Sequence, residues 1–267
     1  MTGLRIGPRA AVAVVLSGVL GIAAFCWPLI VDPGAALARG ADAPLTFALL
    51  LPLALAVVLA EVSEGGMDAK AVAMLGVLSA LGAAVRAVGA GTAGIETVFF
   101  LIILAGRVFG PGFGWVLGNT TLFASALLTG GIGPWLPYQM LGAAWVGMLA
   151  GLLPRSSGRV ELVLLAGYGM VASLAYGMLL NLSFWPFAIG TGTAVSFVPG
   201  DPVMDNLARL VTFSLATSLG WDIGRAITTV VLVLATGTVL LRVFRRAARR
   251  AVWDRARTGA DVAARQG

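Results

Sequence analysis

The sequence has no histidine and only one lysine among its 267 residues, and these absences exclude several kinds of chemistry. Without imidazole there are no histidine metal ligands, no Ser-His or Cys-His nucleophile pairs and no histidine proton relays. The lysine, Lys70, follows Ala69, whereas a phosphate-binding loop requires glycine before its lysine. We therefore expect no catalytic residue, metal site or cofactor, and predict that the chain is not an enzyme.

Charge is also scarce, because only 11% of the residues are charged while 59% are hydrophobic. The mean hydropathy is +0.96. A soluble domain carries roughly 25% charged residues to cover its surface, so a bilayer must surround most of this chain. With Cys26 as the single cysteine, no disulfide can form within the chain.

The net charge of +6 comes from the C-terminal segment. Basic and acidic residues balance up to Leu241, after which eight arginines face only Asp254 and Asp261. A nucleic-acid-binding arm is one interpretation. Arginines that follow an apolar span are, however, typical of the cytoplasmic side, where they also attract anionic lipid. This favours a basic cytoplasmic tail.

Eight apolar runs predict an all-α bundle of about eight transmembrane helices, with no tandem or inverted repeat. We divide the chain into two additional N-terminal helices (1–60), a six-helix core (61–243) and the basic tail (244–267). The first run precedes an A-x-A sequence at Ala36 and Ala38, but it is too long for a signal peptide and predicts an uncleaved helix. The runs cover residues 10–31, 44–60, 71–88, 96–106, 115–128, 138–153, 160–182 and 223–241.

The segment 207–219 is apolar but short, and charge placement decides its role. If it does not span, both termini lie in the cytoplasm with Arg107 and the turn from Arg155 to Arg159. We therefore expect a multi-pass cell-membrane protein in which this segment lies at the outer surface or is re-entrant. Residues 183–205 form the longest predicted extramembrane stretch, and residues 109–113 a tight reversal.

Small residues recur at three- and four-residue spacing along the third predicted helix, so they share one face. Such a face allows close approach of another helix in lipid. Packing within this chain and docking of another protein both explain it. The face consists of Ala69, Ala73, Gly76, Ala80 and Ala84.

Polar and aromatic residues gather near the predicted outer ends of the helices and are candidates for lining one cavity. Asp222 and Arg225 are three residues apart and can simply pair, and aromatic residues also anchor helices at the interface. The candidate substrate-binding residues are Arg86, Glu96, Trp135, Tyr138, Gln139, Asn181, Trp185, Asp222 and Arg225, with Trp221 nearby.

Two stretches resemble the membrane-embedded substrate-binding subunits, or S components, of energy-coupling factor vitamin importers. One is residues 101–154, with a glycine-rich reversal, a GPW-x-P-x-Q loop and a G-x-x-x-G-x-L-P ending. The other reads TSLGWDIGRAITTVVLVLATG, before the arginine tail. The resemblance covers roughly residues 69–250, and the two N-terminal helices depart from the minimal six-helix pattern.

The resemblance implies a six-helix core whose outward-facing cavity holds one vitamin or vitamin precursor. It implies as partners an integral coupling subunit and two cytoplasmic ATPase subunits, with docking through the alanine-rich face of the first core helix. The GPW-x-P-x-Q and SLGWD-x-G-R-A phrases look most like cobalamin-type members, while riboflavin or another flat aromatic vitamin suits Trp135, Tyr138 and Trp185 equally. The alternatives are a structural or assembly membrane protein and a self-contained secondary transporter, the latter disfavoured by the absence of histidine and of a repeat.

Overall fold

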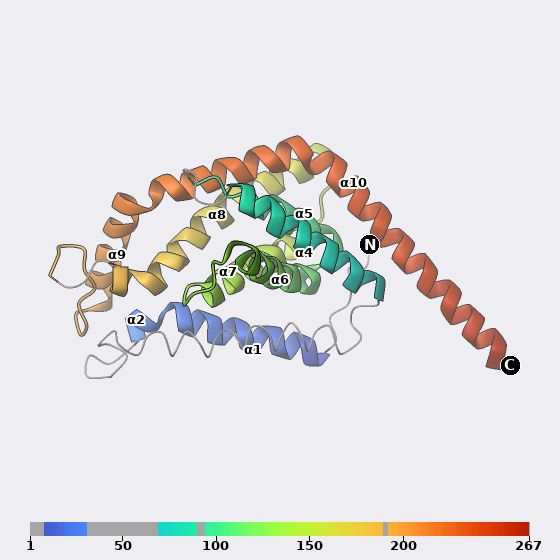
Figure 1. Ribbon diagram of the computed structural model, residues 1–267, viewed down its shortest axis with the longest axis horizontal. Helices are drawn as coiled ribbons and strands as arrows, with labels where there is room; N and C mark the ends of the chain where they lie inside the picture. The colour runs from blue at the N-terminus through green and yellow to red at the C-terminus, as the bar shows by residue number, and fades with distance from the viewer. Residues whose placement is uncertain (1–7, 31–68, 90–93, 189–191, 267) are drawn as a thin grey trace.

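The computed structural model describes residues 8–30, 69–89, 94–188 and 192–266, and within these ranges it contains helices and no strand (Figure 1). This confirms the all-α class. The helices are α1 (Pro8–Phe25), α2 (Trp27–Ile30), α4 (Ala69–Gly89), α5 (Phe99–Phe109), α6 (Pro111–Thr129), α7 (Leu136–Leu152), α8 (Gly158–Ala188), α9 (Val203–Thr217) and α10 (Leu219–Gln266). The predicted helix 44–60 lies outside the described residues.

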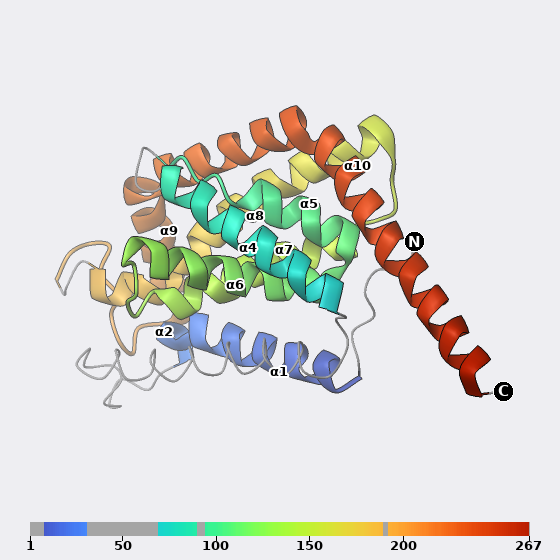
Figure 2. The same ribbon diagram turned by 45° about the vertical axis from the view of Figure 1, so that its right-hand side comes forward.

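The bundle is built around α5, α6 and α7, whose side chains are mostly buried. Helix α6 packs between α7 and α4, while α8 and α10 run side by side along the α5 side (Figure 2). Helix α9 contacts α8 and α10 at one end of the bundle. Large apolar side chains such as Val77, Val163 and Val231 are exposed on the outer helices. A lipid environment accounts for this surface, because water would disfavour it.

Glycines bring α7 against α5 and α6 at backbone distance. A Cβ atom at Gly147 would overlap the carbonyl group of Gly114, and one at Gly118 would overlap the backbone of Ala143. A Cβ atom at Gly151 would lie within 3.0 Å of backbone atoms of Gly106, Gly110 and Pro111. The G-x-x-x-G-x-L-P sequence therefore forms a close helix contact of the small-xxx-small kind.

The tight reversal is shorter than the sequence indicated. Gly110, with φ 101°, makes the turn alone, and α6 begins at once with Pro111. Proline at the first position of a helix is favourable, because the N–H that it lacks would have no partner there. The prediction that residues 109–113 form a loop was therefore wrong, and α6 starts four residues before the predicted Trp115.

Other helix boundaries also differ from the prediction. Helix α8 continues through Pro186 to Ala188, so Trp185 lies in a helix. Helix α10 starts at Leu219, before the predicted start at Ile223, and continues without a break to Gln266. Near the N-terminus, the predicted helix 10–31 is divided at Cys26, two residues before Pro28, into α1 and α2.

Within the described part, three segments are long and apolar enough to cross a membrane: Ala69–Gly89, Gly158–Pro186 and Leu219–Arg249. The count of about eight spans stays a prediction. Helix α9 has 15 residues, one face of which is buried through Asn206, Leu210, Phe213 and Ser214. This helix is too short to span the roughly 30 Å of hydrocarbon, because each residue adds only about 1.5 Å.

Candidate functional site

Four of the predicted site residues meet at one end of the bundle, which we call the Arg86 end. Arg86 lies in the last turn of α4, Glu96 lies in the loop before α5, and Asp222 and Arg225 lie in the first turns of α10. We call these four residues and Tyr176 of α8 the outer charged cluster, after the side of the membrane on which the charged residues are predicted to lie. Two positive and two negative side chains are thus gathered from two helices and a loop.

The cluster contains two ion pairs. Arg86 Nε lies 3.3 Å from Glu96 Oε1, and Arg86 also donates a hydrogen bond of 3.1 Å to Ser125 Oγ on α6. Arg225 donates a 2.7 Å hydrogen bond to Asp222 Oδ1 and a 3.2 Å bond to the Ser173 carbonyl on α8. The pairing of Asp222 with Arg225, expected from their spacing, is confirmed.

Tyr176 belongs to the cluster through its contact with Arg225, and it was not among the predicted site residues. The Arg225 guanidinium carbon is 5.1 Å from the Tyr176 ring centroid, a cation–π arrangement. The Tyr176 ring also packs edge-to-face on Phe99, the first residue of α5, with 4.9 Å between the ring centroids. A tyrosine inside an apolar run gives no sequence signal of its own. Its contact with Arg225 depends on how α8 packs against α10, which the sequence does not show.

Polar atoms in this cluster retain unused hydrogen-bonding capacity. Arg86 Nε, Glu96 Oε1 and Arg225 Nε are buried and make no hydrogen bond, although Arg86 Nε and Glu96 Oε1 face each other at 3.3 Å as an ion pair. Burial raises the pKa of Glu96, while the positive charges of Arg86 and Arg225 partly lower it. Buried polar atoms are nearly always satisfied in folded proteins, so the unbonded Arg225 Nε and an ion pair without hydrogen-bond geometry are unusual features of this cluster.

The remaining candidate residues lie outside this cluster. Tyr138 and Trp185 are buried, and their polar atoms bond to the Ala24 carbonyl at 3.4 Å and the Val195 carbonyl at 2.6 Å. Asn181 donates hydrogen bonds of 3.0 and 2.5 Å to Ser214 and Ser218, which ties α8 to α9.

Tyr138 packs edge-to-face on Phe25 of α1, and Trp185 on Phe197. Trp135 is 43% exposed beside the loop before α7, and Gln139 is half-buried. The structure therefore does not bring these side chains into the outer charged cluster.

All five residues of the small-residue face on α4 are exposed: Ala69, Ala73, Gly76, Ala80 and Ala84. The opposite face is buried through residues such as Leu75, Leu78 and Gly82. Ser79 and Thr120 hydrogen-bond across the α4–α6 contact at 2.6 Å. Among the described residues, α4 thus packs through the other face, and none of them buries the small-residue face.

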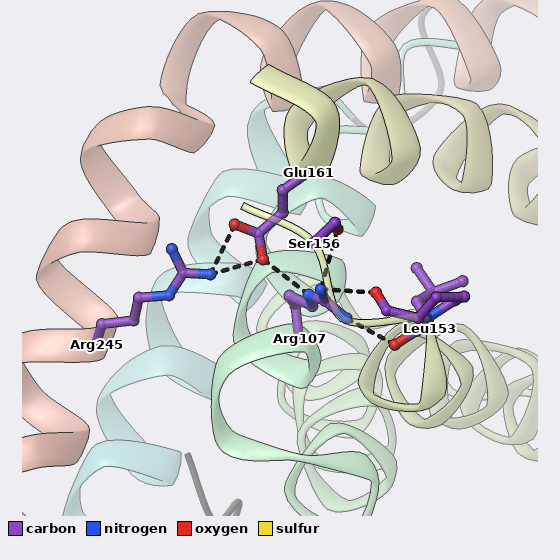
Figure 3. A network of polar contacts seen from close by, with 6 residues as sticks. Arg107, Leu153, Ser156, Glu161 and Arg245 are labelled. Carbon is purple, nitrogen blue, oxygen red and sulfur yellow. Dashed lines mark hydrogen bonds and ion pairs between the residues drawn. The ribbon is translucent and has the colours of Figure 1, made fainter. Parts of the chain in front are cut away.

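A second polar network lies at the opposite, Arg107 end of the bundle (Figure 3). Glu161, 1% exposed, accepts a 2.9 Å bond from Arg107 Nε and bonds of 2.6 and 2.7 Å from Arg245. Arg107 also donates to the carbonyls of Leu153 and Pro154, at the C-terminus of α7, where the helix dipole favours positive charge. Glu161 was not among the predicted site residues, although an acidic residue at the start of an apolar span is a signal of function.

The helical architecture, the apolar exterior and the three membrane-length helices fit an α-helical membrane protein. Comparison with known proteins gives no closer placement: no family model, no curated protein and no solved structure matches this chain.

Proposed function

We propose that this chain is the substrate-binding membrane subunit of an ATP-driven energy-coupling factor importer, and that its ligand is a vitamin or vitamin precursor, with a cobalamin-like compound favoured. In this proposal the Arg86 end faces outward and holds the ligand. The energy for transport comes from two ATPase subunits through an integral coupling subunit. The basis is the resemblance of residues 101–154 and 217–237, to which the geometry adds support at two places.

The outer charged cluster is the observation that carries the ligand-binding part of the proposal. Three buried atoms of Arg86, Glu96 and Arg225 lack hydrogen bonds, and the Tyr176 ring offers an aromatic face beside them. Such a mixture of charged donors, an acceptor and a ring suits a solute that combines polar substituents with a ring system. Carboxamide, hydroxyl or carboxylate groups of a vitamin meet this description.

The exposed small-residue face supports the docking part. Five small residues over four turns of α4 leave a flat apolar strip on which a helix of another subunit can lie at close distance. In lipid this van der Waals contact drives association, because burial of apolar surface gives no advantage over lipid tails. The same face would also serve self-association in an assembly protein, so the two functions need separate experiments.

The first experiment measures equilibrium binding of the purified chain to a panel of vitamins and corrinoids. We expect one compound to bind far more tightly than millimolar. Arg225→Gln should weaken that binding about 10- to 100-fold, because a hydrogen bond to a charged group is lost. Arg209→Gln is the matched control, since Arg209 pairs with Asp201 outside the cluster. Binding of no compound below millimolar would refute the ligand-binding assignment.

The second experiment places leucine at Ala80 and Ala84. We expect ligand binding to persist, while uptake in cells and co-purification of the coupling subunit are lost, because leucines keep the partner helix at a distance. Ala175→Leu with Ala235→Leu is the control, since both alanines are exposed on other helices. Unchanged uptake would contradict docking at this face, and dissociation of a homo-oligomer without any effect on uptake would favour an assembly protein.

A further inference from the structure

A pocket between α8 and α10 lies next to the Glu161 network. Its volume is about 420 Å³, within the range of small-ligand sites. We call it the α8–α10 arginine pocket. It is lined by three arginines, one acidic residue, one hydroxyl, two leucines and the first residue of α8, namely Arg159, Arg242, Arg245, Glu161, Thr238, Leu162, Leu241 and Gly158.

The charges in this pocket do not cancel. Both carboxylate oxygens of Glu161 are already engaged by Arg107 and Arg245. Arg159 and Arg242 form no ion pair with any described residue, and both are exposed. Thr238, Arg242 and Arg245 follow one another at four- and three-residue spacing and therefore share one face of α10. Two unpaired guanidinium groups, an available hydroxyl and the positive end of the α8 dipole thus converge on one space.

The surroundings of the pocket are apolar. Leu162 and Leu241 line the pocket beside its polar groups, and elsewhere around the same two helices Val160, Val163, Val239 and Val243 are 53–70% exposed. Both helices are membrane-length segments; Arg159 lies at the start of α8, and Arg242 and Arg245 follow the apolar part of α10. A positively charged recess on two apolar, membrane-length helices matches a molecule with an anionic head and apolar chains, because each part meets its preferred environment.

We infer that the α8–α10 arginine pocket binds the phosphate headgroup of an anionic phospholipid, with its acyl chains along the apolar surface of α8 and α10. Arg159 and Arg242 donate to the phosphate oxygens from the two sides, and Thr238 adds a neutral donor. Arg245 is held by Glu161 and supplies its remaining N–H groups. This site is independent of the proposed importer function, since it lies at the end of the bundle opposite the outer charged cluster.

The test titrates the full-length chain in neutral detergent with phosphatidylglycerol and counts bound lipid by native mass spectrometry. Arg159→Gln with Arg242→Gln should weaken binding about 30-fold, because each arginine contributes about fivefold near an anionic group. Arg246→Gln with Arg249→Gln removes equal charge from exposed positions of the same helix that do not line the pocket. This control should change binding less than about threefold.

Two further results are expected, and two others would overturn the inference. Phosphatidylcholine should bind much more weakly, because its choline offsets the phosphate charge, and Arg159→Lys with Arg242→Lys should retain most of the affinity for phosphatidylglycerol. Equal losses in the pocket and control variants would show a diffuse electrostatic effect and overturn the site. Displacement of phosphatidylglycerol by millimolar inorganic phosphate would instead assign the pocket to a soluble anion and overturn the lipid inference.

Discussion

Glu161 holds two arginines from different helices while it is itself almost fully removed from solvent. Arg107 is 8% exposed, so the loss of its carboxylate partner would leave a buried positive charge uncompensated. Removal of one partner from such a buried pair is much more harmful than replacement of the whole pair.

We therefore expect Glu161→Gln to lower the free energy of unfolding by about 3 to 5 kcal/mol. The measurement is denaturant unfolding of the purified protein in micelles. Asp205→Asn is the matched control, because Asp205 is an exposed acid at the start of α9, and this change should stay within about 0.5 kcal/mol. Comparable losses in the two variants would mean that the Glu161 network contributes little.

Glu96 should make stability depend on pH with a defined sign. Because burial raises the pKa of Glu96 above its ordinary value of 4.5, the folded protein binds this proton more tightly than the unfolded chain does. Between pH 4.5 and the raised pKa, the free energy of unfolding should therefore fall as pH rises. The glutamine in Glu96→Gln does not titrate. The free energy of unfolding of the wild type minus that of this variant, measured across the interval, should therefore isolate the decline. A difference that is flat or rises over this interval would contradict the buried position of Glu96.

At this scale the sequence predicted local pairs better than distant ones. Asp222 and Arg225 lie on one helix turn, so their spacing alone predicted their contact. Tyr176 joins the same cluster only because α8 crosses α10 at that level, which is a property of the tertiary packing. Trp185 was expected beside a ligand but lies buried against Phe197, since α8 continues farther than the apolar run suggested.

Among the helices, α7 shows most clearly how glycine determines packing. A Cβ atom at Gly147 would overlap backbone atoms of Gly114 on α6. The two backbones cannot move apart to relieve this overlap without separating the helices.

Gly147→Ala should therefore destabilise the protein by about 1 to 3 kcal/mol, the usual penalty for overpacking. Gly167→Ala on α8 is the matched control: nothing lies within 4 Å of a Cβ atom there, so the better helix propensity of alanine should leave stability equal or slightly higher. Thermal unfolding of both variants in the same detergent measures the difference. A neutral Gly147→Ala would show that α6 and α7 are not in backbone contact.

Helix existence was predictable where apolar runs are long, and helix ends were not. The predicted run 71–88 and the observed α4 agree within two residues, because charged and glycine-rich segments flank this helix. The predicted start of α6 was too late because proline usually interrupts a helix. Pro111 is instead a favourable first helical residue after the turn at Gly110. The continuation of α8 through Pro186 likewise depends on tertiary packing, which the sequence pattern does not show.

Viewed as a whole, the bundle has charged clusters at its two ends and apolar helices between them. The outer charged cluster is electrically balanced, whereas the Arg107 end carries arginines in excess of Glu161 and continues into the arginine-rich part of α10. Retention of positive residues on the cytoplasmic side favours an orientation with the Arg107 end inside. This orientation depends on whether α9 crosses the membrane, because α9 follows α8 and precedes α10 in the chain and contacts both helices at the opposite end.

Reporter fusions at three positions test this layout. With about 22 Å of length, α9 does not span, so fusions after Gly200 and after Ser218 should both report the exterior, and a fusion at the C-terminus should report the cytoplasm. If α9 crossed the bilayer, the fusion after Ser218 would report the cytoplasm and the C-terminal fusion the exterior. That result would place the arginines of α10 on the side that membrane insertion disfavours, and the proposed ligand-binding end, which contains the start of α10, would no longer face the exterior as an importer requires.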